Sequence, residues 1–343
     1  MKKKKALIFG INGQDGSYLL RFLLKKNYKV FGVIRRSSNF NTQRIDDIYN
    51  DKNNKEYFKL VYGDITDSIS VLNIIKQTKP NEIYNLAAQS HVQVSFELPE
   101  YTAQVDGIGA LRILEAIRSL RLKNTKYYQA GTSEMFGKSF PPQNELTKFE
   151  PQSPYAAAKL YAHWITACYR DSYKIFACNG ILFNHESPVR GGTFVTKKIV
   201  RALCRIKFKK EKILYLGNLY SKRDWGHAQD YVESMWKMLQ IKKPDDYVIC
   251  SEKSYSVKEF VNLVSEELKM NVFWKGKGLN EVGYYNNNPI IKIDKKYFRP
   301  LEVNHLKGSA KKAQKILKWK PKNSIKKLIK DMINFEINEI QKS

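Results

Sequence analysis

The segment from residue 6 to residue 34 constrains the fold of this chain more than any other. Residues 6–9 are apolar, glycines follow at positions 10, 13 and 16, and an amphipathic stretch at 17–26 precedes a second apolar run at 28–34. This order of strand, glycine turn, helix and strand is typical of a dinucleotide site. The glycines let the backbone approach a pyrophosphate, and the free N–H groups at the start of the helix face that anion. The segment therefore predicts a dinucleotide site lined by Gly10, Asn12, Gly13, Gln14, Asp15 and Gly16.

The composition is that of a globular protein. Of the 343 residues, 43% are hydrophobic and 13% aromatic, which excludes a disordered chain. No apolar run approaches the roughly 20 residues that a membrane-spanning helix needs, so we expect no membrane partner. The four cysteines lack the spacing of disulfide or metal pairs, which predicts small core residues in a reducing cytoplasm and no bound metal: Cys168, Cys178, Cys204 and Cys250.

The net charge of +27 raises the question of a nucleic-acid partner. The lysines are scattered along the chain, and no stripe of aromatic residues interleaved with lysines appears apart from a basic region at 195–212. We therefore expect no nucleic-acid partner, although the charge should favour anionic ligands.

Strand-like and helix-like patterns alternate through the first half of the chain. The apolar runs at 6–9, 30–34, 58–62, 83–87, 126–130 and 175–182 indicate strands, and 17–26, 68–77, 103–121 and 155–171 indicate helices. The alternation predicts an α/β fold with a doubly wound parallel Rossmann sheet. From about residue 186 the rhythm is lost, which predicts a smaller α/β substrate-binding portion. We place a nucleotide-binding domain at 1–185, with part of 224–250 returning to it, and a substrate domain at 186–223 and 251–343.

The residues after the second strand bear on which dinucleotide binds. Sites for NAD place an acidic residue there to hold the ribose 2′-hydroxyl, whereas this chain has Arg35, Arg36, Ser37 and Ser38. Forked, permanently charged guanidiniums suit a 2′-phosphate, so the segment favours NADP over NAD.

Two further segments are expected to line the same cofactor. Asp64 and Ile65 follow the third strand, where an acid can hydrogen-bond the adenine amine. The residues after the fourth strand should pass beneath the nicotinamide half: Leu86, Ala87, Ala88, Gln89 and Ser90.

A tyrosine and a lysine share one helical face further along. Ser153 and Pro154 read as the N-cap and first turn of a helix in which Tyr155 and Lys159 lie four residues apart. A phenol with a reference pKa of about 10 is a poor base at neutral pH. A nearby ammonium and a cationic nicotinamide should lower that pKa and make Tyr155 a proton acceptor.

A carboxylate distinguishes the site from that of a simple alcohol dehydrogenase. The fifth strand is followed by Thr132, Ser133 and Glu134. Either hydroxyl could orient a substrate oxygen, and Glu134 could remove a proton from the carbon beside a newly formed ketone, which leads to elimination. The alternative is that Glu134 is an exposed or capping residue.

These residues belong to a set of motifs that resembles the GDP-mannose 4,6-dehydratase family of the extended short-chain dehydrogenase/reductase superfamily. The resemblance covers nearly the whole chain. Its motifs are GINGQDGSYL (10–19), RRSSNFNTQRI (35–45), YNLAAQSHVQVSFELPEYTAQVDGIG (84–109), GTSEMFG (131–137), SPYAAAK (153–159), LFNHESP (182–188), KRDWGHAQDYV (222–232) and YFRPLEVNHLKG (297–308).

The resemblance implies a cycle without net redox change. Tyr155 would take the proton of the sugar O4 while hydride passes from C4 to NADP, with Thr132 assisting at O4 and Lys159 holding the nicotinamide ribose. Glu134 would remove the C5 proton, water would leave from C6, and the hydride would return to C6.

The resemblance also implies further binding residues and an assembly. Tyr101, His185 and Arg190 would line the cofactor. The GDP-sugar would be bound by Ser90, Asn184, Lys197, Arg223, Arg299 and Glu302, with arginines on the diphosphate and Glu302 near the GDP ribose. Members of the family typically form tetramers, in which the loop at 35–44 reaches a neighbouring cofactor, so we expect a homo-oligomer (a tetramer or a dimer).

Three departures from the family pattern leave the sugar open. Val189 and Gly192 replace an arginine and a glutamate, Tyr220 replaces an aspartate, and Asn12 replaces a common threonine. A small Gly192 could admit an extra carbon at C6, so GDP-manno-heptose is an alternative substrate. An epimerase or reductase on the same scaffold, and a non-enzymatic protein that binds NADP or nucleic acid, are the remaining alternatives.

Overall fold

The computed structural model describes residues 3–38 and 41–342. Residues 39 and 40, which belong to the motif at 35–45, lie outside it. The first segment forms β1 (Lys5–Phe9), α1 (Gln14–Lys25) and β2 (Lys29–Ile34). No helix of the described residues is long and apolar enough to span a membrane.

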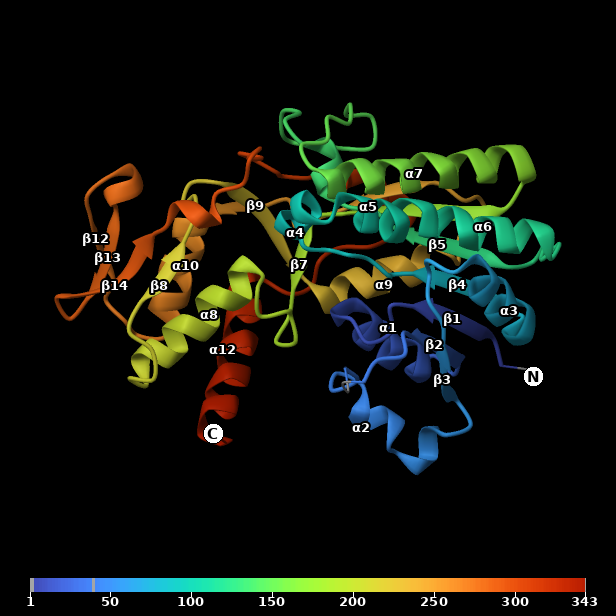
Figure 1. The fold of residues 1–343 in the computed structure, drawn as a ribbon, viewed down its shortest axis with the longest axis horizontal. Coiled ribbons are helices and arrows are strands. Elements are labelled where there is room, and N and C mark those ends of the chain that lie inside the picture. Colours follow the sequence, from blue (N-terminus) through green and yellow to red (C-terminus); the bar gives the residue numbers. More distant parts are fainter. Residues whose placement is uncertain (1–2, 39–40, 343) are drawn as a thin grey trace.

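The central sheet has seven strands, and every pairing in it is parallel (Figure 1). Their order is β10-β6-β5-β4-β1-β2-β3, which confirms the predicted doubly wound fold. Strands 1 and 4 are neighbours, so the order reverses beside β1, where ligands of such sheets bind. The other strands of the sheet are β3 (Phe58–Tyr62), β4 (Glu82–Asn85), β5 (Lys126–Ala130), β6 (Phe176–Leu182) and β10 (Asp246–Ile249).

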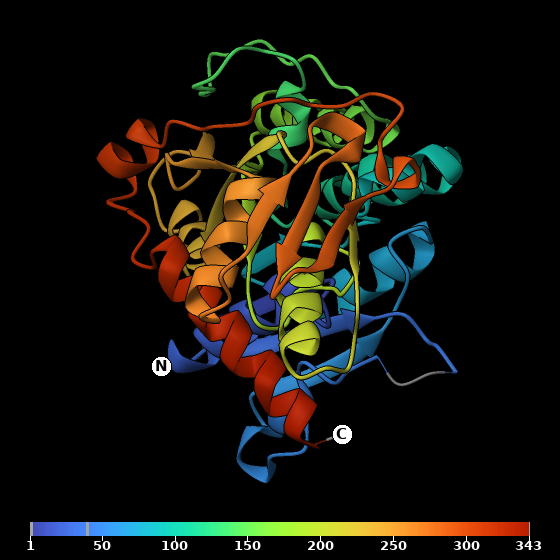
Figure 2. The same ribbon diagram turned by 90° about the vertical axis from the view of Figure 1, so that its left-hand side faces the viewer.

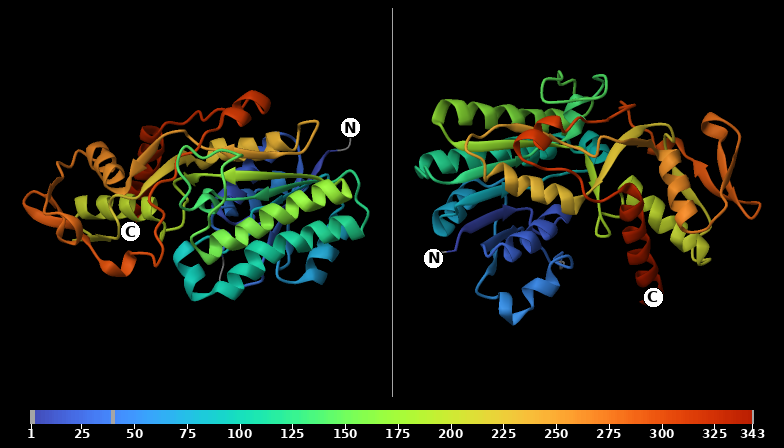
Figure 3. Two further views of the ribbon diagram at one scale, coloured as in Figure 1. Left: turned by 90° about the horizontal axis from the view of Figure 1, so that it is seen from above. Right: turned by 180° about the vertical axis from the view of Figure 1, so that it is seen from behind.

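Helices cover both faces of this sheet, each over its own apolar core (Figure 3). On one face α1 packs against α9 (Ala228–Met238), and Leu20 and Met235 belong to one buried cluster. On the other face α3 (Ser68–Thr78) packs on α6 (Gly109–Ser119), which packs on α7 (Pro154–Tyr173). The remaining short elements of this half are α2 (Asp46–Tyr49), η1 (Lys52–Asn54), α4 (Val92–Glu97), α5 (Pro99–Thr102), η2 (Ala103–Ile108) and η3 (Ser133–Phe136).

The second half of the chain builds a separate apolar cluster and two small sheets (Figure 2). The cluster lies among α8 (Val195–Lys207), α10 (Val257–Glu267) and α12 (Ile325–Lys342). The sheets are β11-β9-β7 and β12-β13-β14-β8. Their strands are β7 (Asn184–Glu186), β8 (Leu214–Leu216), β9 (Lys222–His227), β11 (Ser254–Ser256), β12 (Phe273–Lys275), β13 (Val282–Tyr285) and β14 (Asn288–Ile293), with η4 (Gly278–Asn280), η5 (Lys295–Tyr297) and α11 (Lys311–Ile316) between or after them. The domain boundaries given above stay a prediction.

Two details differ from the sequence-based expectation. The helix expected over 103–121 starts with a π-helical turn at 103–108, where a Cβ on Gly107 would lie 3.3 Å from the Ala158 carbonyl oxygen, so close packing against α7 accompanies the distortion. Cys168 was expected in the core but is exposed, because it lies on the outer face of α7 with Tyr161 and Trp164.

Steric contacts require glycine at position 10 of the turn, and this requirement gives a first testable prediction. Gly10 has φ of +81°, and a Cβ there would lie 2.8 Å from the backbone of Leu86 and Ala87. We expect Gly10→Ala to lower the free energy of unfolding by clearly more than Gly278→Ala. Gly278, the control, has φ of +57° and open space around it, so its substitution should lower the free energy of unfolding by only about 1–2 kcal/mol. Urea denaturation measures both, and equal losses would show that the close approach at Gly10 carries no extra cost.

Candidate active site

A cavity of about 1030 Å³ runs from the glycine turn, past the carboxyl ends of β1, β4 and β5, into the second half of the chain. It brings together most of the predicted site residues. Those that line it are Gly10, Asn12, Gly13, Gln14, Asp15, Gly16, Arg35, Asp64, Ile65, Leu86, Ala87, Ala88, Ser90, Tyr101, Thr132, Glu134, Tyr155, Lys159, Asn184, His185, Arg190, Arg223, Arg299 and Glu302. Arg36 and Ser37 line an adjoining hollow, whereas Ser38, Gln89 and Lys197 line neither.

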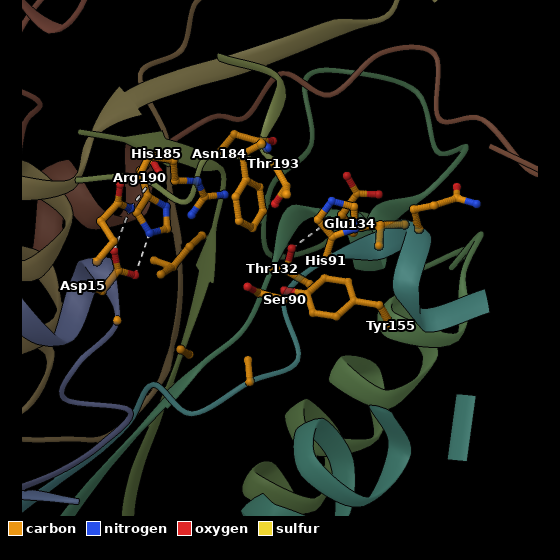
Figure 4. Close-up of a pocket in the computed structure, with 18 of the residues that line it drawn as sticks. Asp15, Ser90, His91, Thr132, Glu134, Tyr155, Asn184, His185, Arg190 and Thr193 are labelled. Atoms are coloured by element: carbon orange, nitrogen blue, oxygen red, sulfur yellow. Dashed lines mark hydrogen bonds and ion pairs between the residues drawn. The ribbon is translucent and has the colours of Figure 1, made fainter. Parts of the chain in front are cut away.

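The start of α1 faces this cavity. Gly13 is the N-cap and provides no side-chain cap, so the N–H groups of the first turn remain available to an anion. Asp15, in that first turn, accepts a hydrogen bond from His185, with 2.7 Å between Oδ2 and Nε2, and the His185 ring stacks on Tyr231 at 4.5 Å (Figure 4). The Asp15 carboxylate thus has a cationic partner beside the place expected for a pyrophosphate.

The ionisation of this pair is set by competing effects. Burial alone would raise the pKa of Asp15, but the charge and hydrogen bond of His185 hold it below its usual range. Burial opposes the charge on His185, but the Asp15 carboxylate raises the pKa of His185 above its ordinary value. Each group therefore favours the charged form of the other.

The opposite end of the predicted cofactor site carries the arginines. Arg35 donates from Nη1 to the Tyr101 hydroxyl at 2.8 Å. The adjoining hollow is lined by Arg35, Arg36, Ser37 and Asp64. Its two guanidiniums are suited to binding a phosphate group. One Asp64 oxygen, Oδ1, accepts hydrogen bonds from the backbone and hydroxyl of Thr66, so this carboxylate also closes its own turn.

The predicted catalytic groups meet in the middle of the cavity, and all are buried (Figure 4). Thr132 caps η3 and accepts from the Glu134 backbone N–H at 3.2 Å. Lys159 donates to the Ala130 carbonyl at 3.2 Å, and its Nζ lies 5.9 Å from the centre of the Tyr155 ring. Glu134 is therefore neither an exposed nor a capping side chain.

The pKa of Tyr155 moves against the sequence-based expectation. Burial raises the pKa of this phenol, and Asp106 and Glu134 raise it further, whereas the Thr132 hydroxyl and Arg190 lower it. Burial also lowers the pKa of Lys159. In the protein alone, the loss of hydration outweighs the nearby positive charge, so lowering of the Tyr155 pKa requires charge brought by a ligand.

Glu134 faces two arginines that come from the second half of the chain. Its Oε1 lies 3.9 Å from Arg223 Nε and 3.7 Å from Arg299 Nη1. Arg223 also donates to the Val303 carbonyl at 2.7 Å and reaches Glu302 at 3.5 Å. Arg223 is anchored in this way, and the two guanidiniums lie beside a carboxylate that can accept a proton from a bound molecule.

Lys197 was assigned to the GDP-sugar, but the structure places its neighbour in the cavity instead. Lys197 is buried against α12, whereas Lys198 lines the cavity, with its Nζ 3.5 Å from the centre of the Tyr297 ring. Successive residues of a helix point about 100° apart, so only one of the two can face the site. The sequence analysis also missed further lining residues, among them His91, Thr193, Phe194, Asn218, Ser221 and Tyr297. The apolar face of α8 could have shown which lysine is buried.

Comparison with known proteins identifies the family. The family described as GDP-mannose 4,6 dehydratase matches residues 7–332. A GDP-mannose 4,6 dehydratase of Drosophila melanogaster is 54% identical, over 100% of this chain and 88% of the relative. A GDP-mannose 4,6 dehydratase 1 of Arabidopsis thaliana is 55% identical (98% and 90%), and a GDP-mannose 4,6-dehydratase of Vibrio cholerae is 51% identical (99% and 95%). The chain belongs to the GDP-mannose 4,6-dehydratase family.

Solved structures of other enzymes share the fold. The UDP-glucose 4-epimerase of Thermotoga maritima, solved with UDP-glucose, superposes with a TM-score of 0.80 at 20% identity, over 98% of this chain and 99% of that chain. The dTDP-glucose 4,6-dehydratase of Bacillus anthracis, solved with NAD, gives 0.79 at 19% identity, over 98% of both chains.

The positions that depart from the family pattern differ in their local surroundings. At Val189 the backbone carbonyl accepts from Arg44 at 2.8 Å, a contact that does not depend on the side chain. A Cβ on Gly192, which lines the cavity, would have Arg201 as its nearest neighbour, at 3.5 Å, so space is available there. Tyr220 donates to Glu281 at 2.5 Å, which ties the loop after β8 to the start of β13.

The Asp15–His185 pair predicts a pH dependence of stability. Because the pKa of His185 is raised above 6.5, its contribution should be full below that pH and be lost as pH rises through the raised value. Because the pKa of Asp15 is lowered from 3.8, its contribution should be present above that pH and be lost as pH falls through the lowered value. We therefore expect Asp15→Asn to cost about 3 kcal/mol, with the largest loss between these two pH values.

Urea denaturation of both proteins from pH 3 to pH 9 measures this difference. Asp47→Asn, which breaks the exposed ion pair with Arg21, is the control and should cost no more than about 1 kcal/mol. A loss in Asp15→Asn that does not vary with pH would contradict the charged-pair assignment.

Proposed function

We propose that this protein is an NADP-dependent GDP-mannose 4,6-dehydratase, which converts GDP-mannose to GDP-4-keto-6-deoxymannose. The observation that carries the proposal is the buried Glu134 carboxylate in the same cavity as Tyr155 and Thr132. An alcohol dehydrogenase needs the tyrosine and the hydroxyl, and the additional base is what an elimination requires. The 50–55% identity to relatives named for this reaction supports the assignment.

Tyr155 and Lys159 would serve the oxidation at C4. Bound NADP supplies a hydride acceptor and a positive charge. Tyr155 accepts the proton of the sugar O4 as the C4–H bond breaks, and Thr132, whose hydroxyl helps to lower the pKa of Tyr155, binds the same oxygen. Lys159 is buried beside the phenol and binds the nicotinamide ribose.

Glu134 would serve the elimination. A ketone at C4 acidifies the proton on C5, and Glu134 accepts it. The C6–O bond then breaks as Glu134 passes this proton to the departing hydroxyl, which leaves as water. Hydride then returns to C6, and C5 takes a proton from the solvent while Tyr155 gives up the proton it took from O4. The guanidiniums of Arg223 and Arg299 favour the ionised carboxylate that this step needs. Oxidation and reduction cancel, so the balance is the loss of one water.

Cations and a carboxylate in the second half of the cavity fit the nucleotide of the substrate. Arg223, Arg299 and Lys198 would neutralise the diphosphate, in line with a bidentate role for arginine. Glu302, which accepts from Ser221 at 3.2 Å, would bind the GDP ribose, with Ser90 and Asn184 on the sugar.

The residues of the first half fit NADP. The glycine turn leaves room for the pyrophosphate, with His185 beside it, and Arg190 and, at the Arg35 end, Tyr101 also line the cavity. The two arginines of the adjoining hollow would bind the 2′-phosphate. The homo-oligomer and the cytoplasmic location stay predictions.

GDP-manno-heptose is the second candidate substrate. The lack of a side chain at Gly192, where a Cβ would be in ordinary van der Waals contact with Arg201, favours it, because a longer chain at C6 needs room that a larger side chain would fill. Turnover of both GDP-sugars by one preparation compares them, and the heptose alternative fails if only GDP-mannose reacts.

The reaction can be tested in deuterated water. We expect a product lighter than GDP-mannose by one water and carrying deuterium at C5. Glu134→Gln should lower dehydration roughly 100-fold or more while C4 oxidation, seen as NADPH absorbance, continues. Tyr155→Phe should abolish that absorbance as well. Full turnover by Glu134→Gln, or a product that keeps its C6 oxygen, would refute the proposal.

The cofactor can be tested by substitution in the adjoining hollow. We expect Arg36→Ala to weaken NADP binding about tenfold or more, because one charge-assisted contact to the 2′-phosphate is lost, and to leave NAD binding nearly unchanged. Titration of protein fluorescence measures both affinities. Arg118→Ala, which removes an exposed arginine paired with Glu115, is the control. An equal loss for NADP and NAD would contradict the 2′-phosphate assignment.

A further inference from the structure

One segment of chain crosses from β6 to α8 along the wall of the cavity. Residues 182–194 lead from the end of β6 through β7 to the start of α8, and His185, Glu186, Arg190 and Thr193 all line the cavity (Figure 4). We name residues 187–193 the crossing loop. Its position determines where Arg190 and Thr193 lie relative to cofactor and sugar.

Side chains from distant parts of the chain hold the crossing loop. Ser187 donates to Gln14 of α1 at 2.8 Å, and the carbonyl of Val189 accepts from Arg44. The Pro188 carbonyl, between them, accepts from Lys197 Nζ at 2.6 Å. The first two contacts tie the loop to the nucleotide-binding half, and the third ties it to α8.

Lys197 also contacts helix α12, near the end of the chain. Its ammonium forms an ion pair with Glu336 of α12 and lies 4.4 Å from the centre of the Phe335 ring. The side chains of Lys197 and Glu336 are only 7% and 8% exposed. Such a pair is held firmly, because a partner left alone would be a buried, unpaired charge.

Helix α12 is itself held in place by apolar packing, so it can support the Lys197 side chain. Its buried face includes Leu328, Met332 and Ile333, which belong to the same apolar cluster as Leu203 of α8. Figures 1 and 2 show α8 and α12 side by side. Glu336 lies one turn beyond Met332 on this buried face, where an apolar residue would ordinarily pack.

We propose that Lys197 is a positioning residue, which links α12 through Glu336 to the Pro188 carbonyl and thereby sets the crossing loop for binding of NADP and GDP-mannose. The ligands named here rest on the proposed function. Lys197 itself contacts neither, so its effect on binding is transmitted through the loop. The C-terminal helix becomes part of the active-site architecture.

The proposal is tested with four proteins: the wild type, Lys197→Met, Glu336→Leu and the double variant. Tm, the NADP dissociation constant from fluorescence titration, and kcat and KM for GDP-mannose are measured for each. We expect both single variants to lower Tm, since each leaves one buried charge alone, and the double variant to recover most of that loss.

Binding should respond differently from stability. Lys197→Met should raise the KM for GDP-mannose and the NADP dissociation constant at least fivefold, with a smaller effect on kcat. The double variant should keep these defects despite its recovered Tm, because the Pro188 carbonyl still lacks its donor. Lys342→Met, which breaks an exposed pair with Glu339 on the same helix, is the control and should change none of these quantities.

Two outcomes would overturn the proposal. The first is that folded Lys197→Met binds both ligands with affinities within twofold of those of the wild type. The second is that the affinities of the double variant recover together with its Tm, because Lys197 and Glu336 would then be a purely structural pair. If the wild type does not turn over GDP-mannose, the proposed function fails, whereas NADP affinity and Tm still decide the role of Lys197.

Discussion

The close approach of the glycine turn to the backbone after β4 is the constraint on which the rest of the site depends. A Cβ on Gly10 would meet Leu86 and Ala87 at 2.8 Å, and one on Gly16 would meet the Gly10 carbonyl at 2.3 Å. Because β1 and β4 are adjacent where the strand order reverses, this contact places the start of α1 beside the loop after β4. Dinucleotide and substrate can then share one cavity, with the groups after β5 between them.

The site also depends on the burial of its ionisable side chains. Glu134, Lys159 and Tyr155 are each at most 8% exposed, so every charge that forms there is weakly screened by water. Two arginines stabilise the Glu134 carboxylate, whereas the pKa of Tyr155 is raised in the protein alone. Burial therefore favours the protonated phenol in the protein alone, and it places the Glu134 carboxylate beside two guanidiniums with little water between them.

Much of this site could be predicted from the sequence because its residues follow strands directly. Glycines 10, 13 and 16, the pair Arg35–Arg36, and Thr132 to Glu134 each come at the carboxyl end of a strand, and parallel strands bring those ends together. Tyr155 and Lys159 share a face through helix periodicity alone. The long-range contacts were not predictable. The choice between Lys197 and Lys198 depended on which face of α8 meets α12, and the direction of the Tyr155 pKa depended on the depth of its burial.

By itself, then, the sequence determined most elements of the first half of the chain and the family, because periodicity, glycine spacing and short motifs are local properties of the chain. The tertiary structure alone decided which charges are buried together: Glu134 with Arg223 and Arg299, Asp15 with His185, and Lys197 with Glu336. These partners are separated by 89 residues or more in every case, as their numbers show. Only the packing of helices and sheets determines which distant side chains lose water at the same place.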